Sequence, residues 1–168
     1  MVEIAFGKVV SPAFKSRVIE ICGGLGCDPS FLMAAMAFET GERFTPDVEN
    51  PVSHATGLIQ FMPATAKALG TTIAALAQLS AVEQLDWVER YFKPYSGNLK
   101  SLSDVYMAIL WPSAVGKPEA AILFSAPSQA YEENKGLDSN HDGSVTKGEA
   151  ASRVQNKLSR GLSNGLRG

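Results

Sequence analysis

The segment Asp28-Pro-Ser-Phe-Leu-Met-Ala-Ala-Met-Ala-Phe-Glu-Thr-Gly41 decides the fold, because it is almost uniformly apolar and carries helix signals at both ends. Asp28 followed by Pro29 is a favourable N-cap and first helical position, and Gly41 is a natural helix stop. The sequence therefore predicts a helix that runs to about Thr40. Its large apolar side chains are expected to pack in the core: Phe31, Met33, Met36 and Phe38.

Glu39 is the single ionisable residue of this apolar helix. Burial in apolar surroundings disfavours the charged form of a carboxyl group, so we expect its pKa to be raised. An acid that keeps its proton near neutral pH can protonate a leaving oxygen, which is the first step of glycoside cleavage. Glu39 is therefore the main candidate for a general acid. The alternative is a helix-end glutamate without a catalytic role.

The remaining chain also favours a mainly α fold. Hydrophobic periodicity and capping signals predict further helices at about residues 11–22, 63–70, 80–92, 105–110, 119–124, 128–135 and 147–160. Residues 42–57 contain Pro46, Pro51 and Gly57 and are expected to form an irregular loop. No segment alternates convincingly as a strand.

Composition and charge exclude several classes of protein. The 168 residues are 45% hydrophobic and 19% charged, which favours a globular domain over a disordered chain. The formal net charge of −2 gives no overall field that would attract nucleic acid. No Sec signal peptide is expected at the start, and no stretch approaches the roughly 18–20 apolar residues of a membrane span.

The charge is unevenly distributed, because the residues after 149 carry +4 and the rest carry −6. The four cations of this tail are Arg153, Lys157, Arg160 and Arg167. A weak contact with an anionic membrane is one interpretation, and a solvated helix face is the favoured one.

Cys22 and Cys27 are interpreted as small apolar residues, because a disulfide between them would close a very short loop. A metal site at Cys22 and Cys27 is not expected, because no further Cys or His pair follows in the sequence.

Three segments carry a resemblance to a known family. They read Met36-Ala-Phe-Glu-Thr-Gly41, Ala55-Thr-Gly-Leu-Ile-Gln-Phe-Met-Pro-Ala-Thr-Ala66 and Asp104-Val-Tyr-Met-Ala-Ile-Leu-Trp-Pro112. Their order and content resemble the soluble lytic transglycosylase domains, relatives of goose-type lysozyme, and in particular the phage-encoded members. The most specific part is similar to the family signature GLMQ(I/F)MPxTA. The resemblance covers roughly residues 10–125.

The resemblance implies a lysozyme-like helical fold with a glycan cleft that binds peptidoglycan strands. The bond to be cleaved is MurNAc-β-1,4-GlcNAc, and Glu39 matches the single catalytic acid/base of the family. The residues that match the substrate-binding cleft are Gly57, Leu58, Gln60, Phe61, Met62, Tyr106 and Trp111. Residues 108–116 depart from the family's AYNAG-type motif, so the aromatic that meets the sugar is either Tyr106, which we favour slightly, or Trp111.

Two reaction outcomes remain open. A lytic transglycosylase needs one carboxyl group, which acts as acid and then as base and leaves a 1,6-anhydroMurNAc product. A hydrolytic muramidase (lysozyme) needs a second carboxylate, for which Asp47 and Glu49 in the following loop are candidates. The non-enzymatic alternative is a catalytically inert cell-wall-binding module.

Residues 138–149 fit the twelve-residue EF-hand calcium loop without a gap. The expected Ca²⁺ ligands at positions 1, 3, 5, 7, 9 and 12 are Asp138, Asn140, Asp142, Ser144, Thr146 and Glu149, with Gly143 at the turn. A solitary loop favours a structural role over signalling, and the calcium would dock the last helix onto the catalytic body. A calcium-regulated adaptor would explain this loop but not the segment around Gln60.

The sequence thus predicts a catalytic domain at residues 1–125 and a C-terminal extension at residues 126–168. The expected protein is a monomeric phage endolysin or virion-borne enzyme that acts on the host bacterial cell wall. An endolysin without a Sec signal would reach the wall through a holin.

Overall fold

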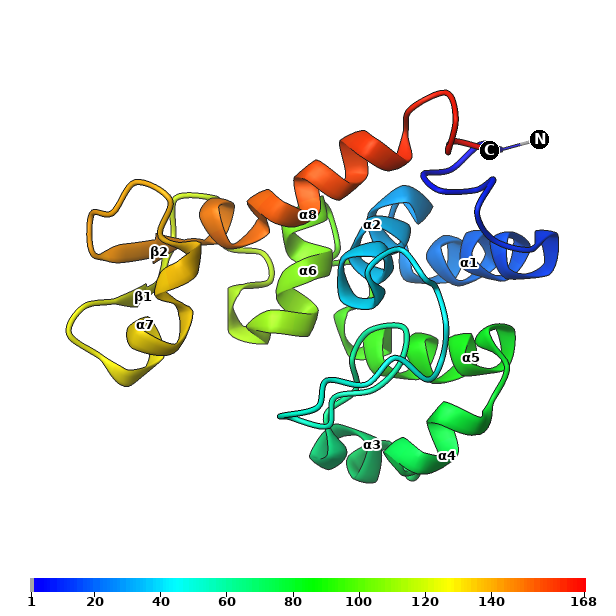
Figure 1. The fold of residues 1–168 in the computed structure, drawn as a ribbon. Helices are drawn as coiled ribbons and strands as arrows, with labels where there is room; N and C mark the ends of the chain where they lie inside the picture. The colour runs from blue at the N-terminus through cyan, green and yellow to red at the C-terminus, as the bar shows by residue number, and fades with distance from the viewer. Residues whose placement is uncertain (1) are drawn as a thin grey trace.

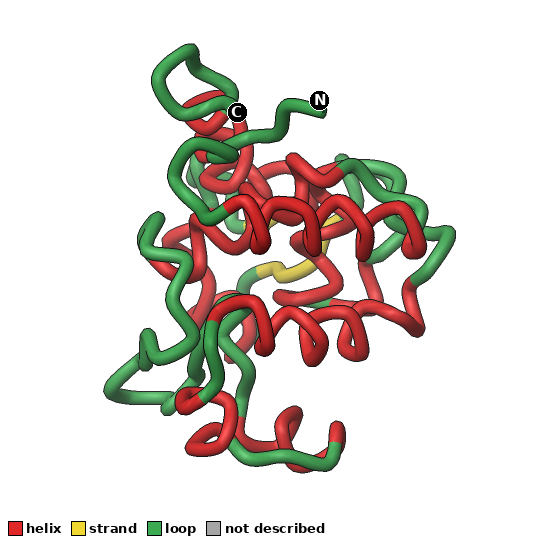
Figure 2. Tube along the Cα trace, turned by 90° about the vertical axis from the view of Figure 1, so that its right-hand side faces the viewer, coloured by secondary structure: helices red, strands yellow, loops and turns green. Residues whose placement is uncertain are grey.

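The computed structural model describes residues 2–168 and is mainly helical, as predicted (Figure 1). Figure 2 shows that most of the chain outside the helices is loop, with strand confined to one short sheet. The α-helices are α1 (Pro12–Leu25), α2 (Pro29–Thr40), α3 (Pro63–Leu69), α4 (Ile73–Gln78), α5 (Ala81–Phe92), α6 (Leu102–Leu110), α7 (Gln129–Asn134) and α8 (Lys147–Gly161). Short 3₁₀ turns follow at Lys93–Tyr95, Pro112–Ala114 and Lys135–Leu137, and the strands are β1 (Ile122–Ser125) and β2 (Ser144–Thr146).

Helix α2 lies at the centre of the core, as its apolar sequence predicts. Residues 32–37 are all buried, and α1, α6 and α8 pack around the helix. The side chain of Asp28 accepts a hydrogen bond from the Ser30 N–H at 2.8 Å, and Gly41 ends the helix with a φ of 60°. Both predicted helix boundaries are confirmed.

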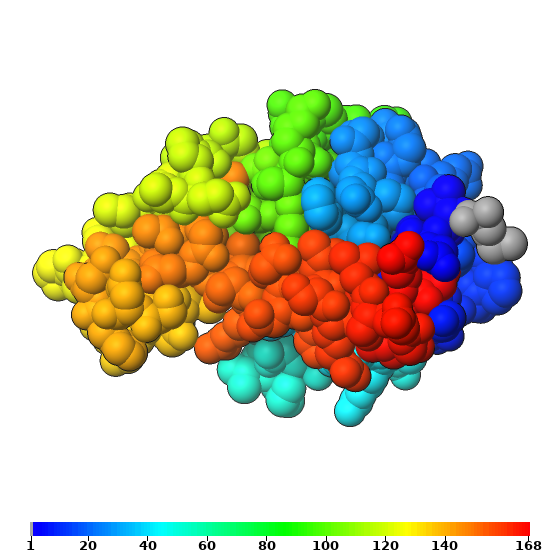
Figure 3. All heavy atoms as spheres, turned by 90° about the horizontal axis from the view of Figure 1, so that it is seen from above, coloured from blue at the N-terminus to red at the C-terminus, as the bar shows by residue number. Residues whose placement is uncertain are grey.

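Helix α8 crosses the molecule and packs along α2 and α6 (Figure 3). The residues before α1 form turns that lie beside the C-terminal end of α8, where the Ile4 N–H donates to Gly168 O at 2.8 Å and the Phe6 N–H to Gly161 O at 2.9 Å. Gly161 is required at this crossing, because a Cβ there would lie 2.4 Å from the Phe6 ring. The last helix is thus part of the main core.

The segment 119–124 was predicted to be helical, and this prediction is wrong. Residues 122–125 form β1, which pairs with β2 in an antiparallel sheet that buries Phe124 and Val145. A short apolar run cannot be assigned to helix or strand from periodicity alone, and the partner strand lies about twenty residues further along. The predicted domain boundary after Ser125 falls at the end of β1, so the two strands of the sheet lie on opposite sides of it.

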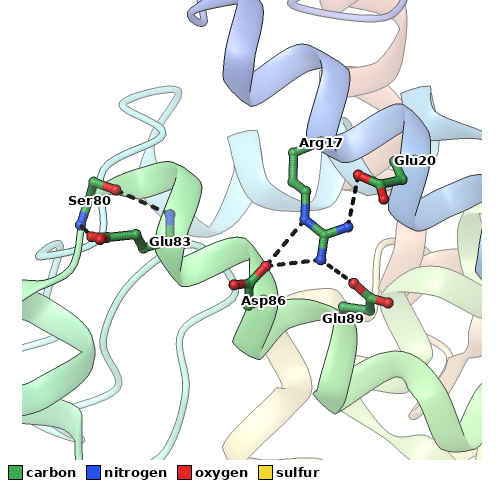
Figure 4. A network of polar contacts seen from close by, with 6 residues as sticks. All are labelled: Arg17, Glu20, Ser80, Glu83, Asp86 and Glu89. Atoms are coloured by element: carbon green, nitrogen blue, oxygen red, sulfur yellow. Dashed lines mark hydrogen bonds and ion pairs between the residues drawn. The ribbon is translucent and has the colours of Figure 1, made fainter.

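Polar contacts join α1 to α5 on the surface (Figure 4). The Arg17 guanidinium bonds Asp86 Oδ1 at 2.9 Å, reaches Glu20 Oε2 at 3.2 Å and pairs with Glu89. The predicted capping box at the start of α5, formed by Ser80 and Glu83, is confirmed.

Among residues 2–168, no single helix is long and apolar enough to cross a membrane. Helices α1 and α2 reach the required length and apolar character only when taken together, and they are bent by 119°.

Candidate active site

Glu39 lies in the last turn of α2, partly buried among apolar neighbours. Burial raises the pKa of its carboxyl group to about 7, as the sequence predicts. Among residues 2–168, no hydrogen bond or ion pair engages this carboxyl group. Glu39 therefore keeps its proton in part of the molecules near neutral pH, and its hydrogen-bonding capacity is available to a ligand.

The end of α2 that carries Glu39 is fixed from two sides. The Thr40 hydroxyl donates to Met36 O at 2.7 Å and accepts from the Phe44 N–H at 3.0 Å, which holds the chain as it leaves the helix. The Glu42 carboxylate accepts from Lys157 Nζ at 2.5 Å and from Arg160 Nε at 2.8 Å, both on α8. These contacts fix the backbone directly after Glu39.

The loop around Gln60 is held by its own backbone and by the Gln60 side chain. Gln60 Nε2 donates to Val48 O at 2.9 Å and to Gly57 O at 3.0 Å, so this amide organises the loop. Leu58 and Phe61 are buried, whereas Met62 is 46% exposed. Of these predicted cleft residues, Met62 and the partly buried Gln60 therefore offer the most side-chain surface to a ligand.

Gln84 is a residue of this loop system that the sequence analysis missed. It is fully buried on α5; its Oε1 accepts from the Leu58 N–H at 2.8 Å, and its Nε2 donates to Pro46 O at 3.0 Å and Leu76 O at 2.9 Å. Gly57 is needed beside it, because a Cβ there would lie 2.4 Å from Gln84 Oε1 and its φ is 87°. The sequence signal for this role is the position of the Gln84 amide on the apolar face of α5, one residue before Leu85.

We expect Gln84→Leu to lower the free energy of unfolding by about 2 kcal/mol, since it leaves buried backbone groups of the loop unpaired. The loop should also become more mobile. Urea unfolding measures the first effect, and hydrogen exchange at the Leu58 amide measures the second. Gln78→Leu at the end of the neighbouring α4 is the matched control. Unchanged exchange at Leu58 in Gln84→Leu would show that Gln84 does not hold the loop.

A small hollow lies beside the Gln60 loop. Its lining comes from the loop and from α3, α5 and α6: Ile59, Gln60, Phe61, Met62, Thr65, Tyr91 and Ile109. The Tyr91 hydroxyl donates to Ala108 O at 2.5 Å, and burial raises its pKa to about 12, so it is neutral and fixes α5 to α6. Glu39, Tyr106 and Trp111 are not among the lining residues.

The two candidate aromatics occupy different environments. Tyr106 is 5% exposed and meets the Phe38 ring edge-on at 5.6 Å between ring centres. Burial, followed by the charge of Glu39, raises the pKa of Tyr106. The phenol of Tyr106 is therefore close enough to Glu39 for the two groups to interact electrostatically. Trp111 is 41% exposed and packs on Phe124 with ring centres 5.0 Å apart. Trp111 therefore presents the larger aromatic surface, although the sequence slightly favoured Tyr106 for contact with a sugar.

The two candidate second carboxylates are both exposed in the loop after α2. Glu49 Oε1 lies 2.7 Å from His54 Nδ1, an interaction between two solvent-facing side chains. Isolated bridges join Glu49 to Thr56 and Thr56 to Phe61, so the loop folds back on itself. Asp47 and Glu49 thus have the surroundings of solvated loop charges.

The loop at residues 138–149 turns tightly, and its carboxylates accept hydrogen bonds from the loop backbone. The buried Asp138 carboxylate accepts from the Gly143 N–H at 3.0 Å and from the Tyr131 hydroxyl at 2.8 Å. Asp142 Oδ1 accepts from the Ser144 N–H at 2.9 Å. Glu149 Oε2 accepts from the Thr146 N–H at 2.8 Å, which closes a capping box at the start of α8.

All four cations of the tail have partners within the molecule. Lys157 and Arg160 pair with Glu42, and Arg167 Nη2 pairs with Glu3 Oε2 at 2.5 Å. Arg153 donates to Gly136 O at 3.2 Å. This pairing reduces the charge that the tail can offer to an anionic membrane.

Comparison with protein-family models and with curated proteins finds no match for this chain.

Proposed function

We propose that this protein cleaves the MurNAc-β-1,4-GlcNAc bond of peptidoglycan by lytic transglycosylation. The observation that carries the proposal is the Glu39 carboxyl group, whose pKa is raised to about 7 by burial and which no protein group engages among residues 2–168. The signature-like segment around Gln60 supports the same assignment. The activity needs one carboxyl group of this kind.

Glu39 performs two proton transfers in the proposed reaction. As an acid it protonates the glycosidic oxygen, and the C1–O bond breaks to give an oxocarbenium-like centre. As a carboxylate it then takes the proton from the C6 hydroxyl of the same MurNAc, whose oxygen closes on C1. A pKa near 7 suits both proton transfers, because the protonated and the deprotonated forms of Glu39 are both populated near neutral pH.

Mass spectrometry of the muropeptides released from purified sacculi tests the proposal. Products that end in 1,6-anhydroMurNAc support transglycosylation with Glu39 as the only acid/base. Products heavier by one water, with a reducing MurNAc end, would instead establish hydrolysis. In that case Glu49→Gln and Asp47→Asn would identify the group that positions the water. A preparation that binds sacculi and releases nothing would favour the inert binding module.

The chemistry of residues 138–149 fits a calcium ion. The side-chain donors are all oxygens, which Ca²⁺ prefers, and the buried Asp138 carboxylate already faces the loop backbone. Asp138, Asn140, Asp142, Ser144, Thr146 and Glu149 would hold the ion. The ion would supply positive charge that offsets the loop carboxylates, and it would hold the start of α8 against β1 and α7.

We expect calcium to raise the melting temperature. At a concentration about 100 times the Kd, binding stabilises the folded state by about 2.7 kcal/mol. For a chain of this size that corresponds to a rise of roughly 5–10 °C. Glu149→Gln should abolish the rise while keeping the capping box, because a glutamine oxygen still accepts from the Thr146 N–H. Magnesium is the control ion, and identical melting curves in calcium and in chelator would refute the site.

A further inference from the structure

The two cysteines of the chain lie on either side of the turn that ends α1. Gly26 adopts a left-handed conformation with a φ of 74°, and both its N–H and the Cys27 N–H donate to Cys22 O, at 2.9 and 3.0 Å. In this helix-ending motif the residue after the left-handed glycine folds back toward the last helical turn, and its side chain frequently packs on that turn. The two backbone bonds therefore place Cys27 beside the last turn of α1, next to Cys22.

The two thiols have different surroundings. Both are free, with Cys22 buried in the core and Cys27 partly exposed. Interaction with the neighbouring thiol, followed by burial, raises the pKa of Cys22, and the same interaction lowers the pKa of Cys27. Cys27 is thus the accessible and more readily ionised partner, and Cys22 is shielded beside it.

We propose that Cys22 and Cys27 form a redox modification site, which closes to an intramolecular disulfide by exchange with a small disulfide oxidant. The Cys27 thiolate attacks one oxidant sulfur, which releases one thiol and leaves a mixed disulfide on Cys27. Cys22 then attacks the Cys27 sulfur and passes its proton to the departing thiolate, which leaves as the second thiol. Two cysteine thiols are oxidised and one oxidant disulfide is reduced to two thiols.

The position of the pair gives the modification a structural effect. Cys27 directly precedes Asp28, the N-cap of α2, so a disulfide would tie the end of α1 to the start of the helix that carries Glu39. The short ring adds a constraint at the bend between these two helices. A protein that leaves the cytoplasm for the cell wall passes from a reducing to an oxidising compartment. This last point rests on the proposed function, whereas the chemistry of the pair does not.

Thiol trapping on the full-length protein tests the proposal. The folded protein is equilibrated with reduced and oxidised glutathione at several ratios, acid-quenched, denatured and alkylated, and then weighed intact. We expect two alkyl groups under reducing conditions. Under oxidising conditions we expect none, with a mass two hydrogens below that of the dithiol. Two alkyl groups at every ratio, or a wild-type protein that stops at a glutathione adduct, would overturn the proposal.

Single variants test the order of attack. Cys22→Ala should retain a glutathione adduct on Cys27, because the resolving thiol is missing. Cys27→Ala should resist modification in the folded state, because Cys22 is buried. An adduct that forms equally fast in both variants would contradict the assigned roles. These readouts are independent of muropeptide release, so failure of the proposed enzymatic function would leave them interpretable.

Discussion

Replacement of Glu39 by glutamine is expected to lower the rate of glycosidic cleavage by at least about 10²–10⁴-fold, the usual contribution of a general acid/base. Glutamine keeps the shape of the side chain but neither donates nor accepts the transferred proton. Release of muropeptides from sacculi measures the effect. Glu20→Gln, at an exposed site on α1, is the matched control and should keep its activity. A Glu39→Gln protein that still cleaves glycan would refute Glu39 as the acid.

The same variant should be more stable than the wild type at alkaline pH, which separates lost catalysis from lost folding. Burial raises the folded-state pKa of Glu39 from 4.5 to about 7, so between these values the folded protein holds a proton that the unfolded chain has released. Stability is therefore fully present below about 4.5 and is lost as the pH rises through about 7. We expect Glu39→Gln to gain about 2 kcal/mol at pH 8 and little at pH 4. Urea unfolding at both values measures the difference.

The pH dependence of activity follows from the same group. The first step needs the protonated acid, so kcat/KM should fall as the pH rises above about 7. A turbidity assay on sacculi in buffers of constant ionic strength measures this profile. Activity that keeps rising through pH 9 would mean that the group which must be protonated is not Glu39.

The second large effect is expected at Lys147, whose removal should lower the free energy of unfolding by about 3–5 kcal/mol. Its side chain is 1% exposed and its ammonium group donates to Asp104 Oδ1 at 2.5 Å and to Lys117 O at 2.7 Å. Lys147→Met removes this partner from the buried Asp104 charge, which keeps the hydrogen bond from the Gly116 N–H at 2.8 Å. The pair joins α6 to the first turn of α8, so its loss weakens the packing of the last helix.

The pH dependence of this defect has a definite sign. Burial opposes ionisation of Asp104, but the hydrogen bonds from Lys147 and Gly116 outweigh it and lower the pKa of the carboxyl group. The pair's contribution is therefore present above the unfolded-state pKa of Asp104 and is lost as the pH falls through the lowered folded value. Thermal unfolding of Lys147→Met at pH 7 should show a melting temperature lower by roughly 10 °C. The deficit should shrink in acid.

Two further variants isolate the buried charge. Adding Asp104→Asn to Lys147→Met removes the unpaired charge and should recover part of the loss. Lys135→Met breaks the exposed pair with Glu132, whose side chains are 63% and 60% exposed, and should cost less than about 1 kcal/mol. Equal losses for Lys135→Met and Lys147→Met would show that burial of the pair carries no special weight.

The parts of the fold that could be predicted are those with local signals. Asp28, Pro29 and Gly41 mark both ends of α2, and Ser80 with Glu83 marks the start of α5. The raised pKa of Glu39 was also predictable, because the helix that carries it is apolar and burial is the cause of the shift. Each of these conclusions depends on residues within one helix or turn.

The missed features depend on contacts between distant segments. Strand β1 forms because it pairs with β2, about twenty residues later. The sequence of residues 122–125 alone does not predict that pairing. Glu42 acquires its role at the end of α2 from Lys157 and Arg160 on α8, more than 110 residues away. Gln84 serves a loop that precedes it by about 26 residues. Such partners become visible only when the fold brings them together.

The position of α8 determines when a newly made chain can acquire its structure. The apolar faces of α2 and α6 are covered by a helix that leaves the ribosome more than thirty residues after α6. Contacts of such long sequence separation form slowly, because the closure of a long loop precedes any gain from them. Until then the nascent chain exposes apolar surface that favours association with other chains. This core can therefore close only after residues 147–161 have been synthesised.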